Sequence, residues 1–308
     1  METIAIVDIG SNTVKLAVYR VDIEKKKFKQ IFKESVYLRL LRYVDSEGYL
    51  NEKGILKLKL ALETFKDRLS YFKPSRVIAF ATYVLRVVKN GEKLIEELKP
   101  IFDIEVLSGE EEAYYSTLGA MLDVKPKNFI TFDIGGGSLE ICRIENGEIK
   151  ICKSYPLGTL EFPDCKIGES FSIECIKAKV EEVVKKDKRI FGESEKLVGI
   201  GGSIRAAKKI AGRRRMKKKF LKQIIEEVVE LKPIELTEKY KIPIERTRTI
   251  LVAVVVALEL MDIFKCKELI ISRYSIREGI LFEKVVNNEE SIRSLKSKAA
   301  NKQGVKLA

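Results

Sequence analysis

The stretch IAIVDIGSNT at residues 4–13 recurs in altered form as ITFDIGGGS at residues 130–138. Each copy is an apolar run rich in β-branched residues that ends in Asp-Ile-Gly and turns at small polar residues. This pattern is typical of a buried strand followed by a tight turn. The two aspartates, Asp8 and Asp133, stand 125 residues apart. The repetition indicates that the chain contains two related halves.

The likeness continues on the carboxyl side of both turns. Second and third strands are predicted at 14–20 and 28–33 in the first half and at 139–144 and 149–154 in the second, where Asn146-Gly147 is a good hairpin turn. Alternating helices and strands then follow. In the first half, helices are expected at 53–71, 84–99 and 109–121, and strands at 76–81 and 103–107. In the second half, strands are expected at 196–199 and 268–272, and helices at 172–190, in a basic region, at 244–264, which is apolar, and at 276–286.

Each half is therefore predicted to follow the order βββαβαβα. We expect one α/β domain at 1–121, a second at 122–290, and a basic tail at 291–308 that is frayed or packs back on the first half. In open α/β sheets, ligands bind beyond the carboxyl ends of the strands, and two such domains form a cleft between them. Both Asp-Ile-Gly turns should face that cleft.

The composition of the 308 residues narrows the chemistry. The chain is 45% hydrophobic and 33% charged, as folded globular proteins are, and it contains no histidine. This excludes Ser-His-Asp and Cys-His catalysis and histidine-ligated zinc, so that acid–base chemistry must use carboxylates, Lys, Tyr or Cys. No apolar run is long enough to cross a membrane. The five cysteines form no CxxC pair, so we expect core cysteines without disulfides in a cytoplasmic protein.

The charge is strongly basic and unevenly distributed. Lys and Arg number 58 against 45 Asp and Glu, and ten of the eighteen residues at 205–222 are basic while none is acidic. A basic protein attracts anions such as nucleic acid, anionic membranes, nucleotides or phosphate polymers. A solvated helix face is the alternative interpretation of the run, but its density favours guidance of a polyanion. The residues assigned to that role are Arg205, Lys208, Lys209, Arg213, Arg214 and Arg215.

The two repeated turns have the composition of phosphate-binding loops. Glycine lets backbone N–H groups converge on an anion, and the hydroxyl and amide side chains add donors. An ordinary glycine hairpin would explain one copy, but two copies at matching points favour phosphate. The candidates are Gly10, Ser11, Asn12, Thr13, Gly135, Gly136, Gly137 and Ser138, and a further strand-to-helix turn adds Gly201, Gly202 and Ser203. Asp8 and Asp133, at the strand ends, are placed to hold Mg²⁺.

Two further segments contain candidate catalytic residues. In SGEEEA (108–113), Ser108 is a plausible N-cap, and acidic residues in the first helical turn are stabilised by the helix dipole. That structural role would account for the acids, and the functional alternative is a general base that takes a proton from water. ATYVLR (81–86) contributes Arg86, which is either an ordinary surface residue or a clamp on a phosphoryl group.

Six motifs together resemble the exopolyphosphatase and guanosine-pentaphosphate phosphohydrolase family, Ppx/GppA. They occur in that family's order and are DIGSNTVKL (8–16), ATYVLR (81–86), SGEEEA (108–113), DIGGGSLE (133–140), GIGGSIRA (199–206) and SRYSIREG (272–279). The family belongs to the actin-like superfamily. The resemblance therefore implies two actin-like (ribonuclease H-like) domains with an interdomain cleft.

The resemblance also implies Mg²⁺-dependent hydrolysis of a terminal phosphoanhydride, in inorganic polyphosphate or in guanosine pentaphosphate, which would become the tetraphosphate. It implies that Glu112 is the catalytic base, with Glu111 as the alternative because three glutamates are consecutive. Asp133 and Glu140 correspond to carboxylates at the metal, and Arg86 to an arginine of the family. The expected partners are these phosphate compounds and a second copy of the chain, with no membrane and no nucleic acid.

The chain departs from the family pattern at a few positions. Thr13 and Lys15 stand where Ser and Arg are usual, and Glu161 where a basic residue is common. Lysine keeps the charge of arginine but loses its bidentate geometry. Two other functions stay open, a kinase with 199–206 as its adenosine loop and a non-enzymatic sensor of nucleotides or polyanions. The basic residues at 205–222 favour polyphosphate over guanosine pentaphosphate.

Overall fold

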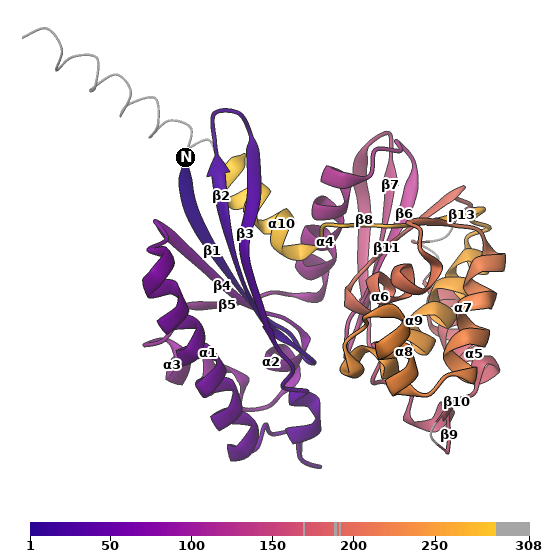
Figure 1. Ribbon diagram of the computed structural model, residues 1–308, viewed down its shortest axis with the longest axis horizontal. Coiled ribbons are helices and arrows are strands. Elements are labelled where there is room, and N and C mark those ends of the chain that lie inside the picture. Colours follow the sequence, from indigo (N-terminus) through magenta and orange to yellow (C-terminus); the bar gives the residue numbers. More distant parts are fainter. Residues whose placement is uncertain (169, 188–189, 191, 288–308) are drawn as a thin grey trace, which may run out of the picture.

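Two α/β halves stand side by side in the computed structural model, each built on its own mixed sheet (Figure 1). The structure describes residues 1–168, 170–187, 190 and 192–287. The predicted basic tail at 291–308 lies outside these residues.

The first sheet has the strand order β3-β2-β1-β4-β5. Its strands are β1 (Glu2–Ile9), β2 (Val14–Asp22), β3 (Lys27–Val36), β4 (Arg76–Ala81) and β5 (Ile104–Val106). The first three strands are antiparallel because short turns join them, whereas β4 and β5 run parallel to β1 because helices connect them. Those helices are α1 (Glu52–Phe72), α2 (Tyr83–Val87) and α3 (Gly91–Leu98), and they share a hydrophobic core with one face of the sheet.

The second sheet repeats this arrangement, with the order β12-β13-β11-β6-β7-β8. Its strands are β6 (Phe129–Ile134), β7 (Leu139–Glu145), β8 (Glu148–Tyr155), β11 (Lys196–Ile200), β12 (Arg215–Met216) and β13 (Glu268–Ile271), and a small hairpin, β9 (Lys166–Ile167) and β10 (Ser170–Phe171), precedes its helices. The helices are α5 (Ile173–Lys186), α6 (Gly202–Ala211), α7 (Lys218–Glu230), α8 (Pro233–Tyr240) and α9 (Ile244–Ile263). Apart from the added edge strand β12, both sheets have the same order, so the predicted duplicated α/β fold is confirmed.

Some predicted elements end earlier than expected. The helix predicted over 84–99 is divided into α2 and α3, because Asn90 bonds the backbone of Leu50 through both its amide nitrogen and its oxygen. These bonds hold the chain between the two helices in a turn. The helix predicted over 172–190 ends at Lys186, and the one predicted over 276–286 finishes in a π-helical turn at Phe282–Val286.

The last helix of each half packs against the sheet of the other half, as Figure 1 shows for α4 (Gly109–Asp123) and α10 (Ile276–Leu281). The two helices cross backbone to backbone at Gly119 and Gly279. A Cβ atom at Gly119 would stand 2.1 Å from the carbonyl oxygen of Ser275, and one at Gly279 would stand 1.9 Å from that of Tyr115. This crossing joins the two halves at a point that tolerates no side chain.

Helix α9 forms the centre of the second half. It is apolar on nearly every side and its residues from Thr249 to Met261 are buried. Among the described residues, no helix combines the length and the apolar run that crossing a bilayer requires.

The prediction that the cysteines form no disulfides is wrong. Cys142 bonds Cys152 across β7 and β8, where the two stand directly opposite each other, and Cys165 bonds Cys175 between the β9 region and α5. Spacing along the sequence did not reveal either pair, because strand register and loop packing bring the sulfurs together. Cys266 is a free, buried cysteine, as expected for the core. Disulfides are uncommon in reducing compartments, so the bridges do not support the cytoplasmic prediction.

The crossing of α4 and α10 can be tested with Gly279→Ala. In an open helix this change would stabilise the protein by about 1 kcal/mol, since alanine is the better helix former. Here the added methyl group meets the Tyr115 carbonyl, so we expect the free energy of unfolding to fall by about 3 kcal/mol instead. Urea denaturation measures the change. Gly212→Ala, where a Cβ atom meets no neighbour, is the control, with an expected loss of about 1 kcal/mol from its positive φ. A Gly279→Ala loss no greater than the control's would contradict the close crossing.

Candidate functional site

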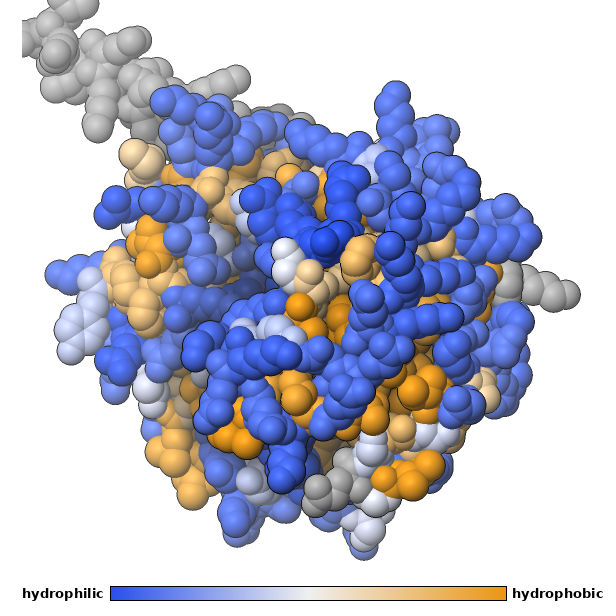
Figure 2. Space-filling model, turned by 45° about the vertical axis from the view of Figure 1, so that its right-hand side comes forward, coloured by the Kyte–Doolittle hydropathy of each residue, from blue (hydrophilic) through white to orange (hydrophobic). Residues whose placement is uncertain are grey.

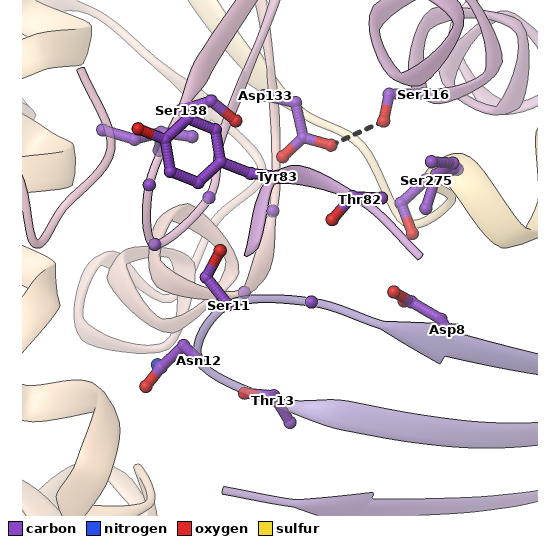
Figure 3. A pocket seen from close by; sticks show the side chains of 18 of the residues that line it. Asp8, Ser11, Asn12, Thr13, Thr82, Tyr83, Ser116, Asp133, Ser138 and Ser275 are labelled. Carbon is purple, nitrogen blue, oxygen red and sulfur yellow. Dashed lines mark hydrogen bonds between the residues drawn. The ribbon is translucent and has the colours of Figure 1, made fainter. Parts of the chain in front are cut away.

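A cleft between the two halves receives the turns that follow β1 and β6 (Figure 3). The expectation that both Asp-Ile-Gly turns face one cleft is thus confirmed. Other lining residues come from the ends of β4, β11 and the helices α2, α4, α6, α9 and α10. The principal lining residues are Asp8, Gly10, Ser11, Asn12, Thr13, Lys15, Thr82, Tyr83, Glu112, Ser116, Asp133, Gly135, Gly136, Gly137, Ser138, Thr159, Gly201, Gly202, Arg205, Arg246 and Ser275.

The two turns have the same internal geometry. Gly10 N donates to the carbonyl oxygen of Thr13 at 3.2 Å, and Gly135 N donates to that of Ser138 at 3.0 Å. In both turns the intervening carbonyls accept hydrogen bonds from a neighbouring loop. The acceptors are Ser11 and Asn12 in the first turn and Gly135 and Gly136 in the second, bonded by the backbone N–H groups of Leu40, Arg39, Thr159 and Leu160. These bonds occupy oxygens that would otherwise repel a phosphate.

The two turns also contact each other at the cleft. A Cβ atom at Gly136 would stand 3.3 Å from Ser11 Cβ and 3.4 Å from Asn12 Cβ. Figure 3 shows Ser11 and Ser138 on the two turns, with Asp133 near them and bonded to Ser116. A phosphoryl group beside the contact of the turns would receive donors from both halves of the chain.

The third Gly-rich turn approaches the cleft from β11. Gly201 has a φ of +107°, and a Cβ atom there would stand 2.8 Å from Asp133 Oδ1, so glycine is required. Gly202 begins α6, whose N-terminus is suited to an anion. Ser203, a predicted phosphate ligand, is buried and shares a hydrogen bond with Thr249 at 2.8 Å. It supports the start of α6 and does not line the cleft.

The structure separates the roles of the consecutive glutamates. Glu111 is exposed, and its carboxylate accepts a hydrogen bond from Ser108 N at 2.8 Å while Ser108 Oγ accepts from Glu111 N. This is a capping box, and hydrogen bonding of the carboxylate to Ser108, mainly to its backbone N–H, lowers the pKa of Glu111. Glu112 points into the cleft and accepts a hydrogen bond from Arg86 NH1 at 3.2 Å. Arg86 is fixed in turn by the carbonyl oxygen of Leu107 at 2.7 Å.

Burial controls the protonation of the carboxyl groups around the cleft. It raises the pKa of Glu112 to about 7, with Arg86 opposing the rise and Asp133 adding to it. Glu140 lies opposite Asp133 in the register of β6 and β7, and burial together with Glu112 and Asp133 raises its pKa well above the usual value. A carboxyl group with a pKa near 7 is suited to general base catalysis at neutral pH.

The predicted metal ligands are not equivalent. Asp133 lines the cleft and accepts a hydrogen bond from Ser116 Oγ at 2.7 Å. Asp8 is already paired with Lys15 Nζ at 2.8 Å and lies 3.8 Å from Arg277 Nε. Glu140 is buried and accepts from Ser154 Oγ at 2.8 Å.

No cluster of three or more potential metal-ligating side chains occurs among the described residues. Mg²⁺ in phosphoryl-transfer sites is commonly held by only one or two carboxylates together with substrate phosphates and water. Asp133, accessible beside both turns, fits such a site. Asp8, neutralised by Lys15, fits it less well.

Sequence reasoning missed two cations, of which one lines the cleft and the other lies beside Asp8. Arg246, at the start of α9, reaches across to Thr13 Oγ1 and Ser203 Oγ, each at 3.5 Å. The sequence signal that could have indicated Arg246 is the polar first turn of α9, which is otherwise apolar. Arg277, in the motif SRYSIREG, does not line the cleft but lies 3.8 Å from Asp8, and its buried Nε and NH1 atoms have no hydrogen-bond partner.

The predicted polyanion residues do not form one surface. Arg205 lines the cleft, and its NH1 atom is buried without a hydrogen-bond partner. The others do not line the cleft. Lys209 donates to the Lys241 carbonyl, Arg213 stacks over Phe220, Arg214 bonds Asp123, and Arg215 pairs with Glu268, while Lys208 is half-buried on α6. The three consecutive arginines line a separate hollow beside the end of α4.

Comparison with known proteins identifies relatives along almost the whole chain. The model of the Ppx/GppA phosphatase family matches residues 18–288. A guanosine-5'-triphosphate,3'-diphosphate pyrophosphatase of Pseudoalteromonas atlantica is 26% identical, over 96% of this chain but only 61% of its own length, so the chain spans less than two thirds of that relative. Exopolyphosphatase 1 of Mycobacterium tuberculosis is 23% identical, over 97% of this chain and 92% of its own.

Solved structures share the architecture. The Ppx/GppA family member of Aquifex aeolicus superposes with a TM-score of 0.77 at 24% identity, covering 92% of this chain and 97% of that one. An exopolyphosphatase of Cytophaga hutchinsonii gives 0.80 at 20% identity, covering 91% and 97%. These likenesses show that the chain has the same two-part α/β fold as those proteins. Since the family model covers residues 18–288, which is well over half of the chain, the chain belongs to the Ppx/GppA phosphatase family.

Proposed function

We propose that the protein is an exopolyphosphatase-type phosphohydrolase that releases the terminal phosphate of inorganic polyphosphate with the help of Mg²⁺. The observation that carries the proposal is Glu112, a carboxyl group with a pKa of about 7 that Arg86 holds in a cleft between two phosphate-type turns. The names of the relatives support a phosphoanhydride substrate.

The chain's own residues supply most of the expected chemistry. Donors of the two turns, which meet at Ser11 and Gly136, hold the terminal phosphoryl group beside that contact. Glu112 accepts a proton from a water molecule as the water oxygen attacks phosphorus, and the bond to the bridging oxygen breaks. Arg86 offsets the negative charge at the base and the phosphoryl group. Catalysis of this kind is mainly positioning and electrostatic stabilisation. Mg²⁺, held by Asp133 when bound, would neutralise charge on the phosphates.

Cationic side chains that line the cleft support a chain of phosphates as the substrate. These side chains are Lys15, Arg205 and Arg246. The buried NH1 atom of Arg205 has no hydrogen-bond partner, which favours an anion beside this atom. Guanosine pentaphosphate presents the same terminal group, and one relative carries the name of a pyrophosphatase for it, so it is the alternative substrate. A sensor without catalysis would have no need for a base with a pKa near neutrality.

Replacing Glu112 with Gln should abolish turnover. Loss of a general base costs about 10²- to 10⁴-fold in rate, whereas the substrate affinity should change little because the turns stay intact. Phosphate release with Mg²⁺ from short polyphosphate, long polyphosphate, guanosine pentaphosphate and ATP measures both activity and preference. Glu111→Gln is the matched control, since glutamine can complete the same capping box. Near-normal turnover by Glu112→Gln would refute the assigned base, and release only from guanosine pentaphosphate would select the alternative substrate.

The pH dependence of kcat/KM should follow the Glu112 carboxyl group. The base acts when deprotonated, so with a pKa of about 7 activity should rise by about tenfold per pH unit below 7 and level off above it. Arg86→Met removes the cation that lowers this pKa, so the midpoint should move to higher pH. Lys153→Met is the control. Lys153, on β8, pairs at 3.5 Å with Glu110, which is in the same turn of α4 as Glu112, so its loss should leave the midpoint unchanged. A midpoint near the ordinary glutamate value would contradict the raised pKa of Glu112.

The salt dependence of polyphosphate binding should distinguish the cleft from the separate arginine hollow. Each cation that contacts a phosphate polymer contributes to counterion release. Arg205→Gln should therefore lower the slope of log affinity against log salt by about one. Arg213→Gln, outside the cleft, should leave the slope unchanged. Titrations of Glu112→Gln protein with polyphosphate at several salt concentrations measure the slope. Equal slopes for Arg205→Gln and the parent would show that polyphosphate binds outside the cleft.

A further inference from the structure

The ring of Tyr83 forms a wall of the cleft that no step above uses. Tyr83 is half-buried and opens α2 directly after Thr82 at the end of β4. Its ring packs against the second phosphate-type turn. A Cβ atom at Gly137 would stand 2.2 Å from Cδ1 and 2.4 Å from Cε1 of the ring. Figure 3 shows the ring lying across the turn that bears Ser138 and facing Ser11.

Contacts on its other sides fix the ring in place. The Arg86 guanidinium carbon lies 5.7 Å from the ring centroid, within the range of a cation–π interaction. Burial and the nearby Glu161 carboxylate raise the pKa of the Tyr83 hydroxyl, so the side chain is neutral at physiological pH. The ring is therefore held between a glycine turn and the arginine that bonds Glu112, and it cannot withdraw without disturbing one of them.

The ring lines the cleft on the same side as Glu112, because Arg86 contacts both the ring and Glu112. Arg205 and Arg246 line the cleft from α6 and α9 instead. A phosphoryl group within reach of Glu112 thus has the Tyr83 ring beside it. The remaining phosphates extend toward the cationic side.

We propose that Tyr83 is a specificity-determining residue, whose ring closes the cleft beyond the terminal phosphoryl group and so admits a free phosphate end but rejects an esterified one. This inference rests on the proposed function and deepens it. A bare phosphate oxygen fits beside the ring, while an alkyl group on that oxygen would need the volume that the ring occupies. A single extra carbon in a shaped pocket is commonly worth about 10- to 200-fold in kcat/KM.

The same reaction can be followed on a blocked chain. On a free end, water adds its oxygen to the terminal phosphorus, its proton passes to Glu112, and inorganic phosphate leaves as the anhydride bond breaks. On an end capped as a methyl ester, the same bonds form and break, and methyl phosphate is released. Phosphorus NMR distinguishes the two products, so one instrument measures both rates.

The test compares linear polyphosphate with free ends and the same chain methylated at both ends. For the parent, the ratio of capped to free kcat/KM should be about 0.1 or lower. Tyr83→Ala should raise the ratio at least tenfold, whereas Tyr83→Phe, which keeps the ring, should leave the ratio at the parent's value. Tyr71→Ala, whose side chain is 81% exposed on α1 away from the cleft, is the control and should behave as the parent does.

The outcomes separate the two proposals. A parent protein that releases nothing from the free chain would overturn the proposed function. A parent active on the free chain, with a Tyr83→Ala ratio within about threefold of its own, would overturn the role of Tyr83 alone. Tyr83→Leu serves as a second, better-packing variant if Tyr83→Ala has a lowered melting temperature, and it must also raise the ratio.

A double-mutant cycle tests the contact itself. Gly137→Ala should sharply lower activity because its methyl group would collide with the ring. Adding Tyr83→Ala should restore part of that loss, giving a non-additive pair. Strictly additive losses would show that the ring does not lie against the turn, and the inference would fail.

Discussion

The structure depends on one close approach, the crossing of α4 and α10 at Gly119 and Gly279. There the backbones of the two helices touch, since any side chain would overlap a carbonyl oxygen about 2 Å away. Each helix packs on the sheet of the other half, so the crossing fixes the spacing between the sheets. Because α4 also bears Glu112 and Ser116, the same contact places the candidate base and the partner of Asp133 between the two turns.

The cleft and the side chains packed against its carboxylates contain more buried cationic nitrogen than those carboxylates satisfy. Asp8 pairs with Lys15 and approaches Arg277, yet Arg277 and Arg205 still have buried nitrogens without a hydrogen-bond partner. Unpaired buried charge is costly, and an anionic substrate would remove that cost by supplying acceptors. Burial acts in the opposite sense on the acids, since it raises the pKa of Glu112 to about 7. The same desolvated site thus favours phosphate and produces a base suited to neutral pH.

Sequence reasoning found the site but could not assign every side chain in it. Asp8, Asp133 and the glycines of both turns were recognised by repetition, and they meet as expected. The choice between Glu111 and Glu112 needed the capping box, which uses the first carboxylate and turns the second toward the cleft. Ser203 looked like a ligand and is instead bonded to Thr249. Arg246 and Tyr83 were overlooked as cleft residues because they follow no repeat, and only chain packing brings them beside the turns.

The sequence by itself determined the duplicated α/β fold, the two turns and the lack of histidine chemistry, because strand periodicity, glycine positions and composition are local properties of the chain. Tertiary structure decided which residues act together. It placed Arg205 in the cleft and the arginines at 213–215 in another hollow, although they are neighbours in sequence. It also paired the cysteines, through register and loop packing. Contacts between distant segments, burial and the pKa shifts that burial causes depend on how the halves pack, and no local pattern records them.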